Sequence, residues 1–343
     1  MFISYDKIDE SLAGRGLTRA HYQLINKATW VVTEKIHGAH FYIIMNAGSI
    51  SYAKRKVVLT PEDDFFGYQH TVDPLRQTLL ALEGDLRQRG LARAEDTILL
   101  YGELCGGGYP HPDVEPNLHV DLVQTGVYYS PDVEFCLFDI AIVENNDMAA
   151  AHFLDYQLVS DVCEQAGLLC AGILFMGSYH EAMRFDIHFE STLPSRLGLP
   201  RLPFPNKAEG VVIKPCEHLQ ITTDKATFRP VLKMKIDAFS EVQFHQSEKW
   251  NDFEPRGSVT HLIRDLLRLV NQNRLMNAAS KIGRIKPGDK EKCIQLRQYL
   301  LEDIADQIRQ HFTPAMNKLT STERETVERH LHAATDELLK EYS

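Results

Sequence analysis

The fold is decided by the stretch Trp30-Val31-Val32-Thr33-Glu34-Lys35-Ile36-His37-Gly38, which runs on into Phe41-Tyr42-Ile43-Ile44. β-Branched and aromatic residues on both sides of a segment that ends in glycine predict a strand, a short exposed turn and a second strand. A lysine placed between a glutamate and a histidine in that turn indicates a nucleophile that forms a covalent intermediate. The alternative is an ordinary surface lysine in a hairpin, so the partners of Lys35 must be sought elsewhere in the chain.

Length and composition indicate an ordinary globular protein. A chain of 343 residues is long enough for two domains. Six cysteines without a CxxC pair predict reduced thiols and an intracellular, most simply cytoplasmic, protein. No run of residues is apolar enough to cross a bilayer, and the first residues do not resemble a targeting signal. We therefore expect a monomer that makes no membrane contact.

Charge is distributed unevenly along the chain. The net charge of -10 disfavours a non-specific nucleic-acid binder, since phosphates attract clustered Lys and Arg. Residues 1–240 carry 21 basic and 31 acidic residues, whereas 241–343 carry 16 of each. A local cationic groove within the acidic whole remains compatible with RNA, because the local field attracts phosphate.

Hydrophobic patterns predict an α+β fold. Residues 1–243 form a domain dominated by antiparallel strands, with strands at 30–45, 50–59, 97–104, 134–143, 209–214 and 231–236 and helices at 74–90 and 155–166. Residues 244–343 form an all-helical domain, because apolar residues recur at helical spacing. Its three faces are Val259, Leu262, Ile263, Leu266, Leu267 and Val270, then Ile294, Leu301, Ile304 and Ile308, then Val327, Leu331, Ala334 and Leu338. Thr322 and Glu325 predict a capping box for the third helix.

A nucleophilic lysine needs neighbours that disfavour its protonated form, because its ordinary pKa is about 10.4. Cations or a metal ion lower that pKa. Basic residues at or within predicted strands are Lys54, Arg55, Lys214, Lys233 and Lys235. Lys233 and Lys235 stand two apart on one strand and therefore project from the same face. If the five converge on one cleft they can also hold a triphosphate; if not, each is a solvated charge.

Two glutamates and a phenylalanine stand at informative strand positions. Glu103 follows a buried strand and Glu209 opens one, and such positions seldom carry acids without a partner. They can bind a ribose hydroxyl, a hydrated Mg²⁺ or simply the lysines. Phe138 is either a stacking surface for a purine or a core residue.

Other patterns do not form a site by themselves. Gly106-Gly107-Gly108 lack the GKT/S ending of a P-loop, and the sequence has no Ser-His-Asp signature. His37 and His40 have no third metal ligand at a suitable spacing. The long loop at 105–131 is expected to be functional or mobile.

Taken in order, these motifs resemble those of the covalent nucleotidyltransferase superfamily of ligases and capping enzymes. Glu34-Lys35-Ile36-His37-Gly38 is similar to its nucleophile motif, and the later motifs match at Glu103, Phe138, Glu209-Gly210-Val211-Val212-Ile213-Lys214 and Lys233-Met234-Lys235. His37, where DNA ligases and capping enzymes usually have aspartate, and the helical tail both resemble the RNA ligase 2 family. Asp63-Asp64-Phe65-Phe66-Gly67-Tyr68 and Ser280-Lys281-Ile282-Gly283 are similar to further stretches of that family.

The resemblance implies an ATP-dependent RNA ligase, active in RNA repair at nicks or breaks, that joins 3′-hydroxyl and 5′-phosphate ends through lysyl-AMP and RNA-adenylate. Lys35 would be the nucleophile, and His37 would act in the later steps. Phe138 would stack on adenine, Glu103 would bind the ribose, and Glu209 would place Mg²⁺ or Mn²⁺. The nucleotide site would comprise Glu34, Lys35, Ile36, His40, Lys54, Arg55, Glu103, Phe138, Glu209, Lys214, Lys233 and Lys235.

The sequence departs from phage-type members of the family, which have Thr-Asn where this chain has Ala39-His40. Its 105–131 loop is also longer, which implies altered recognition of RNA ends. Two other readings remain: a DNA ligase or GTP-dependent capping enzyme of the same superfamily, and a catalytically silent RNA-binding scaffold.

Overall fold

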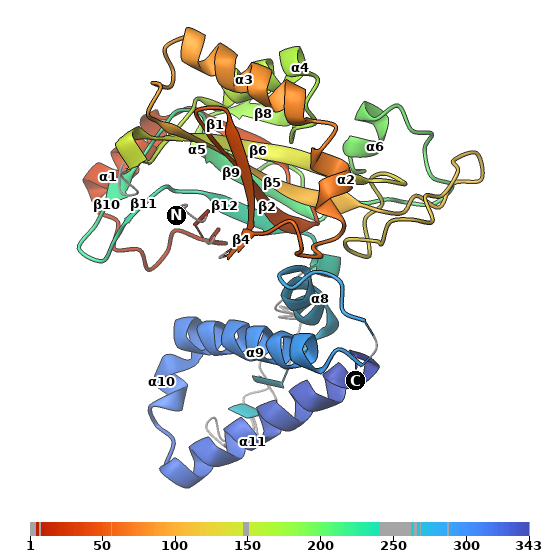
Figure 1. The fold of residues 1–343 in the computed structure, drawn as a ribbon. Coiled ribbons are helices and arrows are strands. Elements are labelled where there is room, and N and C mark those ends of the chain that lie inside the picture. The colour runs from red at the N-terminus through yellow and green to blue at the C-terminus, as the bar shows by residue number, and fades with distance from the viewer. Residues whose placement is uncertain are drawn as a thin grey trace. The chain divides into compact units, whose positions relative to one another are not determined.

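The computed structural model describes residues 5–6, 8–55, 57–146, 151–239, 262–263, 266–267, 269–286 and 288–342. The chain divides into two compact units, here called the N-terminal unit (Met1–Ile236) and the C-terminal unit (Asp237–Ser343). Figure 1 shows that strands belong to the first and helices dominate the second. Within the described residues, no helix is both long and apolar enough to span a membrane.

Two antiparallel sheets build the N-terminal unit. The six-stranded sheet has the order β4-β3-β2-β5-β6-β7, and the four-stranded sheet has the order β12-β9-β1-β8. The larger sheet comprises β2 (Ala39–Asn46), β3 (Ser49–Lys54), β4 (Val57–Leu59), β5 (Thr97–Gly106), β6 (Val133–Val143) and β7 (Ala151–Phe153). The smaller one comprises β1 (Trp30–Glu34), β8 (Ile173–Gly177), β9 (Gly210–Pro215) and β12 (Leu232–Lys235), and β10 (Ile221–Thr222) pairs separately with β11 (Thr227–Phe228). The predicted α+β class with antiparallel sheets is confirmed.

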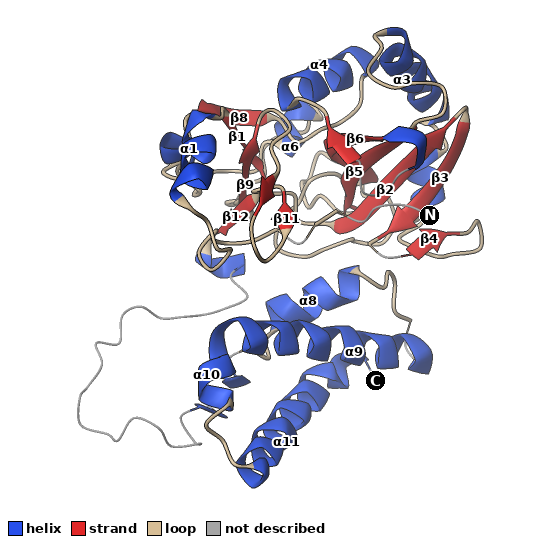
Figure 2. Ribbon diagram, turned by 90° about the vertical axis from the view of Figure 1, so that its left-hand side faces the viewer, coloured by secondary structure: helices blue, strands red, loops and turns tan. Residues whose placement is uncertain are grey.

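Helices cover the outer faces of these sheets. The larger core joins the six-stranded sheet to α2 (Tyr68–Val72), α3 (Arg76–Gln88) and α4 (Tyr156–Ala166), and Figures 1 and 2 show α3 and α4 together over the sheets. A smaller core joins the four-stranded sheet to α1 (Arg19–Lys27) and α5 (Tyr179–Ala182). In β1, Trp30 and Val32 enter the smaller core and Val31 enters the larger one, because alternate residues point to opposite faces. The strand that precedes Lys35 is therefore buried on both sides.

The strand, turn and second strand predicted at 30–45 are present, but the prediction of a hairpin is wrong. β1 pairs with β8 and β9, and β2 pairs with β3 and β5, so the chain crosses from one sheet to the other between Glu34 and Ala39. Glycine is required at the crossing, since a Cβ at Gly38 would collide with the carbonyl of Leu104 in β5. Lys35 thus lies at the junction of the two sheets.

Other local differences from the sequence prediction are small. The predicted strand at 50–59 is divided into β3 and β4, and α6 (Leu193–Arg196) forms one turn within the predicted loop at 193–207. Helix α1 and strand β8 were not predicted. A 3₁₀ turn, η1 (Glu144–Asn146), follows β6.

The C-terminal unit has its own apolar core. Its described elements are η2 (Asp237–Phe239), α8 (Gln272–Ser280), α9 (Lys290–Gln307), η3 (Ile308–Phe312), α10 (Thr313–Met316), α11 (Ser321–Leu338) and η4 (Leu339–Tyr342). The predicted face of α9 is wrong in part: Ile304 is buried as predicted, but Ile294 is 68% exposed, and Leu296 and Leu300 are buried in its place. The capping box of α11 is formed by Thr320 and Glu323, one half-turn before the predicted pair. Of the first predicted face, only Val259 lies outside the described residues: Leu266 is buried in the core, and Leu262, Ile263, Leu267 and Val270 pack against it.

Candidate active site

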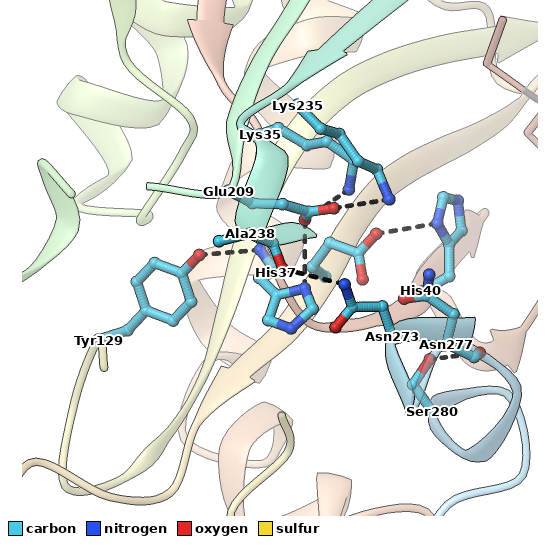
Figure 3. A network of polar contacts seen from close by, with 11 residues as sticks. Lys35, His37, His40, Tyr129, Glu209, Lys235, Ala238, Asn273, Asn277 and Ser280 are labelled. Atoms are coloured by element: carbon cyan, nitrogen blue, oxygen red, sulfur yellow. Dashed lines mark hydrogen bonds and ion pairs between the residues drawn. The ribbon is translucent and has the colours of Figure 1, made fainter. Parts of the chain in front are cut away.

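Three of the predicted site residues contact one buried carboxylate. Glu209 lies just before β9 and forms two ion pairs. One carboxylate oxygen is 2.7 Å from the Lys35 Nζ, and the other is 2.9 Å from the Lys235 Nζ. The His37 Nδ1 lies 3.2 Å from the oxygen that Lys35 contacts. Figure 3 shows both lysines pointing at Glu209. We call Lys35, His37, Glu209 and Lys235 the Glu209 cluster.

Strand geometry explains why these side chains meet. The Lys35 amide donates to the carbonyl of Gly210 at 2.9 Å, which fixes the nucleophile segment beside β9. Lys235 faces Gly210 in the register of β12 with β9. Burial alone would raise the pKa of Glu209, but the charges of Lys35 and Lys235 outweigh burial and hold the pKa well below its usual value. Glu209 is therefore an anion at neutral pH.

The residues that flank Lys35 are both buried, and Glu34 is also anchored by hydrogen bonds. The Glu34 carboxylate accepts hydrogen bonds from the Ser191 hydroxyl and from the amide and hydroxyl of Thr192, each at 2.7 Å. Burial raises the pKa of Glu34, and those hydrogen bonds oppose the rise. Ile36 is buried in the fold. Both predicted site residues thus face protein in the structure.

A second group of predicted residues meets on the six-stranded sheet. His40 on β2 stands opposite Glu103 on β5, and the His40 Nδ1 lies 3.0 Å from the Glu103 Oε1. The Phe138 ring on β6 lies 5.3 Å from the His40 ring and 5.1 Å from the Tyr5 ring. The Glu103 Oε2 is buried and has no hydrogen-bond partner within the described part of the chain. This oxygen is an acceptor that a ligand can use.

A third group, here called the Asp139 cluster, contains only one predicted residue, Lys214. The Asp139 Oδ2 accepts from the Tyr5 hydroxyl at 2.7 Å, the Arg229 Nη1 at 2.8 Å and the Lys214 Nζ at 3.0 Å. The Lys214 Nζ also donates to the carbonyl of Phe138 and lies 3.7 Å from the centroid of the Tyr156 ring. All these side chains are buried, which lowers the pKa of Lys214 to about 8 despite the opposing charge of Asp139.

Sequence reasoning did not identify Tyr5, Asp139 or Arg229. The only local signal was Asp139 itself, a charged residue in the middle of an apolar strand directly after Phe138. Because a buried acid requires a partner, the position of Asp139 predicts a nearby cation.

The remaining predicted cations have other described partners than Glu209. The Lys233 Nζ lies 3.8 Å from the Glu10 Oε1, and the Lys54 Nζ lies 5.4 Å from the centroid of the Phe65 ring. Arg55 directly follows β3, and its charge opposes the burial that raises the pKa of Tyr42. Described contacts join Lys235 alone of the five cations to Glu209.

The carboxylates suit a metal ion only in part. Among the described residues, no group of three or more His, Cys, Asp or Glu side chains is arranged to hold a metal. Mg²⁺ usually keeps several waters and takes one or two carboxylates together with substrate phosphates. Glu209 alone therefore fits an ion that arrives with a phosphorylated ligand, and it does not form a protein cage.

Comparisons with known proteins show the family of the chain. The RNA ligase family model matches residues 28–235, more than half of the chain, and the model of the T4 RNA ligase 2 C-terminal domain matches residues 257–337. The chain is 30% identical to the mitochondrial RNA-editing ligase 2 of Trypanosoma brucei brucei, over 80% of this chain and 75% of that protein. It is 29% identical to the mitochondrial RNA-editing ligase 1 of the same organism, over 82% of this chain and 70% of that protein.

Solved structures are more distant. A Naegleria gruberi RNA ligase mutant with ATP and Mn is 15% identical with a TM-score of 0.42, and the match covers 69% of this chain but 57% of that one. The same ligase with PPi is 16% identical with a TM-score of 0.41, with the same coverage.

The two family matches follow one another along the chain and together identify a ligase. The chain belongs to the RNA ligase family, and its C-terminal match places it in the RNA ligase 2 branch. The predictions of an RNA ligase enzyme and of this family are confirmed.

Proposed function

We propose that the protein is an ATP-dependent RNA ligase that joins a 3′-hydroxyl to a 5′-phosphate through lysyl-AMP and RNA-adenylate, in repair of nicks or breaks. The observation that carries the proposal is the Glu209 cluster, where a partly exposed lysine and a second lysine share one buried carboxylate. That cluster brings a nucleophile, a cation and an imidazole to one point. Family membership favours RNA over DNA or a cap as the substrate.

In the first step, the Lys35 Nζ attacks the α-phosphorus of ATP. The ammonium group first loses one proton to solvent, the N–P bond forms as the bond from that phosphorus to pyrophosphate breaks, and the nitrogen then loses a second proton and keeps one. Lys235, within reach of the same carboxylate, supplies positive charge for the phosphate oxygens. Lys35 is 19% exposed and can turn from Glu209 to the nucleotide, and the buried Glu209 then keeps Lys235 and His37 as neighbours.

The nucleoside would lie on the six-stranded sheet. The half-buried Phe138 ring offers a face for adenine, and the Glu103 Oε2 offers an acceptor for a ribose hydroxyl. His40 holds the other oxygen of Glu103 and so orients that carboxylate. Glu34 and Ile36 act through the backbone, because their side chains are buried in protein.

Phosphates would be held by Arg55, Lys54 and Lys233 in addition to Lys235. Lys214 has a different role: it anchors the backbone of Phe138 and is too deeply buried to meet phosphate directly. A Mg²⁺ or Mn²⁺ ion bound with the nucleotide would be held by Glu209 once the lysines turn to the phosphates, and it would neutralise phosphate charge.

The later steps pass AMP to an RNA 5′-phosphate and then expel it when the 3′-hydroxyl attacks. His37, which shares Glu209 with Lys35, would act there. The N-terminal domain, 1–243, would bind ATP and form lysyl-AMP. The helical domain, 244–343, would dock RNA by shape and phosphate contacts. All six cysteines are unpaired, in agreement with an intracellular protein, and we propose a monomer that makes no membrane contact.

Labelling with ATP that is radioactive at the α-phosphate tests the proposal. A labelled band on a denaturing gel should appear for wild type, vanish for Lys35→Ala and persist for Lys225→Ala, an exposed lysine outside the site. Labelling by GTP alone would support a capping enzyme, and no label in wild type would support a silent scaffold. Sealing of nicked duplex RNA, single-stranded RNA and nicked DNA, compared side by side, then identifies the substrate.

A further inference from the structure

Two loops hold the nucleophile segment from opposite ends. On one side of Lys35, the loop between β5 and β6 supplies Tyr129, whose hydroxyl accepts a hydrogen bond from the His37 amide at 2.8 Å. On the other side, Ser191 and Thr192 bind the carboxylate of Glu34. Figure 3 shows the Tyr129 ring approaching the His37 backbone. Lys35 therefore lies between two anchors, one residue before it and two residues after it.

The two loops are also bonded to each other. The Tyr128 amide donates to the Asn206 Oδ1 at 2.9 Å, and the Asn206 Nδ2 donates back to the Tyr128 carbonyl at 2.7 Å. The Tyr109 hydroxyl donates to the carbonyl of Pro200 at 2.6 Å. The two Asn206 bonds, which lie next to Tyr129 in the chain, join the loop between β5 and β6 to the 190–206 segment in one brace beside Lys35. The Tyr109 bond lies 20 residues before Tyr129 in the chain and is not part of that brace. The long loop, which the sequence suggested to be functional or mobile, is thus packed.

Tyr129 is suited to hold a backbone amide. Its side chain is buried, and burial together with the charge of Glu34 raises its pKa well above the usual value, so it stays a neutral phenol. Phenylalanine would fill the same volume but would leave the His37 amide without this acceptor. A buried amide that loses its partner is destabilised, so the backbone moves until the amide finds another acceptor.

We infer that Tyr129 is a positioning residue for Lys35 and His37, acting through the backbone of the turn that carries them. The inference rests on the proposed function and adds to it a residue outside the family's motifs. Displacement of reacting groups by about 1 Å costs on the order of 100-fold in rate. Loss of one anchor should therefore slow catalysis even though Tyr129 touches no ligand.

Single-turnover formation of lysyl-AMP tests the role, with Tyr109→Phe as the matched control because it removes a loop hydroxyl bond that does not reach the nucleophile segment. We expect Tyr129→Phe to lower the rate constant by about 10-fold or more, with the final labelled fraction and the ATP KM within about 2-fold of wild type. Tyr109→Phe should match wild type in all three. An unchanged rate constant for Tyr129→Phe, or a smaller labelled fraction at an unchanged rate, would overturn the inference.

Hydrogen exchange separates this inference from the proposed function. Amide exchange in a peptide that includes His37 should accelerate in Tyr129→Phe and not in Tyr109→Phe, whether or not the protein reacts with ATP. Unchanged exchange in Tyr129→Phe would show that the hydroxyl does not hold the amide. Absence of lysyl-AMP in wild type would instead contradict the proposed function.

Discussion

The Glu209 cluster and the Asp139 cluster are built from the same parts, a buried carboxylate between two basic side chains, but they differ in exposure. Lys35 is 19% exposed, whereas Lys214 and Arg229 are 1% and 4% exposed. A partly exposed ammonium group can leave its partner for solvent or a ligand, and a fully buried one cannot. The exposure of the cation, more than the pairing itself, therefore distinguishes a reactive site from a structural one.

The largest effect that we expect is at Lys35, where a substitution tests whether the exposed lysine is reactive rather than structural. Lys35→Met should abolish lysyl-AMP completely, because no other group can hold AMP at this position. It should lower the free energy of unfolding by less than a substitution of Asp139 does, because the buried Glu209 keeps Lys235 as its partner. Labelling and urea unfolding of the same preparation measure both quantities. A large stability loss would show that Lys35 belongs to the structural class.

Substitution of His37 should distinguish the first step of the reaction from the later ones. His37→Ala should still form lysyl-AMP, because Lys35 keeps Glu209 and Lys235 as neighbours. Sealing should fall by about 10²–10⁴-fold, the usual loss when a group that transfers protons is removed. The two activities are measured on one enzyme preparation, with His180→Ala, an exposed histidine, as the control. Full sealing by His37→Ala would remove the imidazole from the mechanism.

In the Asp139 cluster, a substitution should reduce the stability of the fold rather than remove a reactive group. Asp139→Asn leaves Lys214 and Arg229 buried without their anion and should lower the free energy of unfolding by about 3–5 kcal/mol. Urea unfolding checks the value against Asp186→Asn, an exposed aspartate. A change near zero in Asp139→Asn would mean that the two cations reach water after all.

The smallest effect that we expect is a dependence of the stability loss in Asp139→Asn on acidic pH. Burial raises the pKa of Asp139, but Arg229 and Lys214 outweigh burial and lower it below the usual value. A lowered folded-state pKa gives stability that is present above the unfolded pKa of about 3.9 and is lost as the pH falls through the folded value. The penalty of Asp139→Asn should therefore shrink as the pH falls below about 4. A penalty that stays constant down to pH 3 would argue against the ion pair as its source.

Local sequence patterns predicted the elements better than their partners. The strands around Lys35 were visible in their β-branched residues, but whether β1 pairs with β2 or with β8 and β9 depends on residues more than 130 positions away. The face of α9 was misassigned because Ile294 fits helical spacing as well as Leu296 does, and only the neighbouring helices select between them.

The same distinction holds for the candidate site. Motif spacing identified Lys35, His37, Glu209 and Lys235, which the fold brings together. Tyr129 lies in an irregular loop and Tyr5 near the N-terminus, where a single tyrosine has no periodic context to mark it. Lys214 was recognised as a site residue, but its burial and its bond to Phe138 follow from tertiary packing.

The crossing at Lys35–Gly38 has a mechanical consequence. At one end of this segment, the Lys35 amide is hydrogen-bonded to β9, and at the other end the chain enters β2, which pairs with β5. If one sheet slides over the other, the distance between the Lys35 amine and the Glu209 carboxylate must therefore change. Substitutions deep in either hydrophobic core, far from the chemistry, should therefore reduce turnover before they reduce folding. For an engineer, the interface of the two sheets is the place to install a ligand-controlled switch.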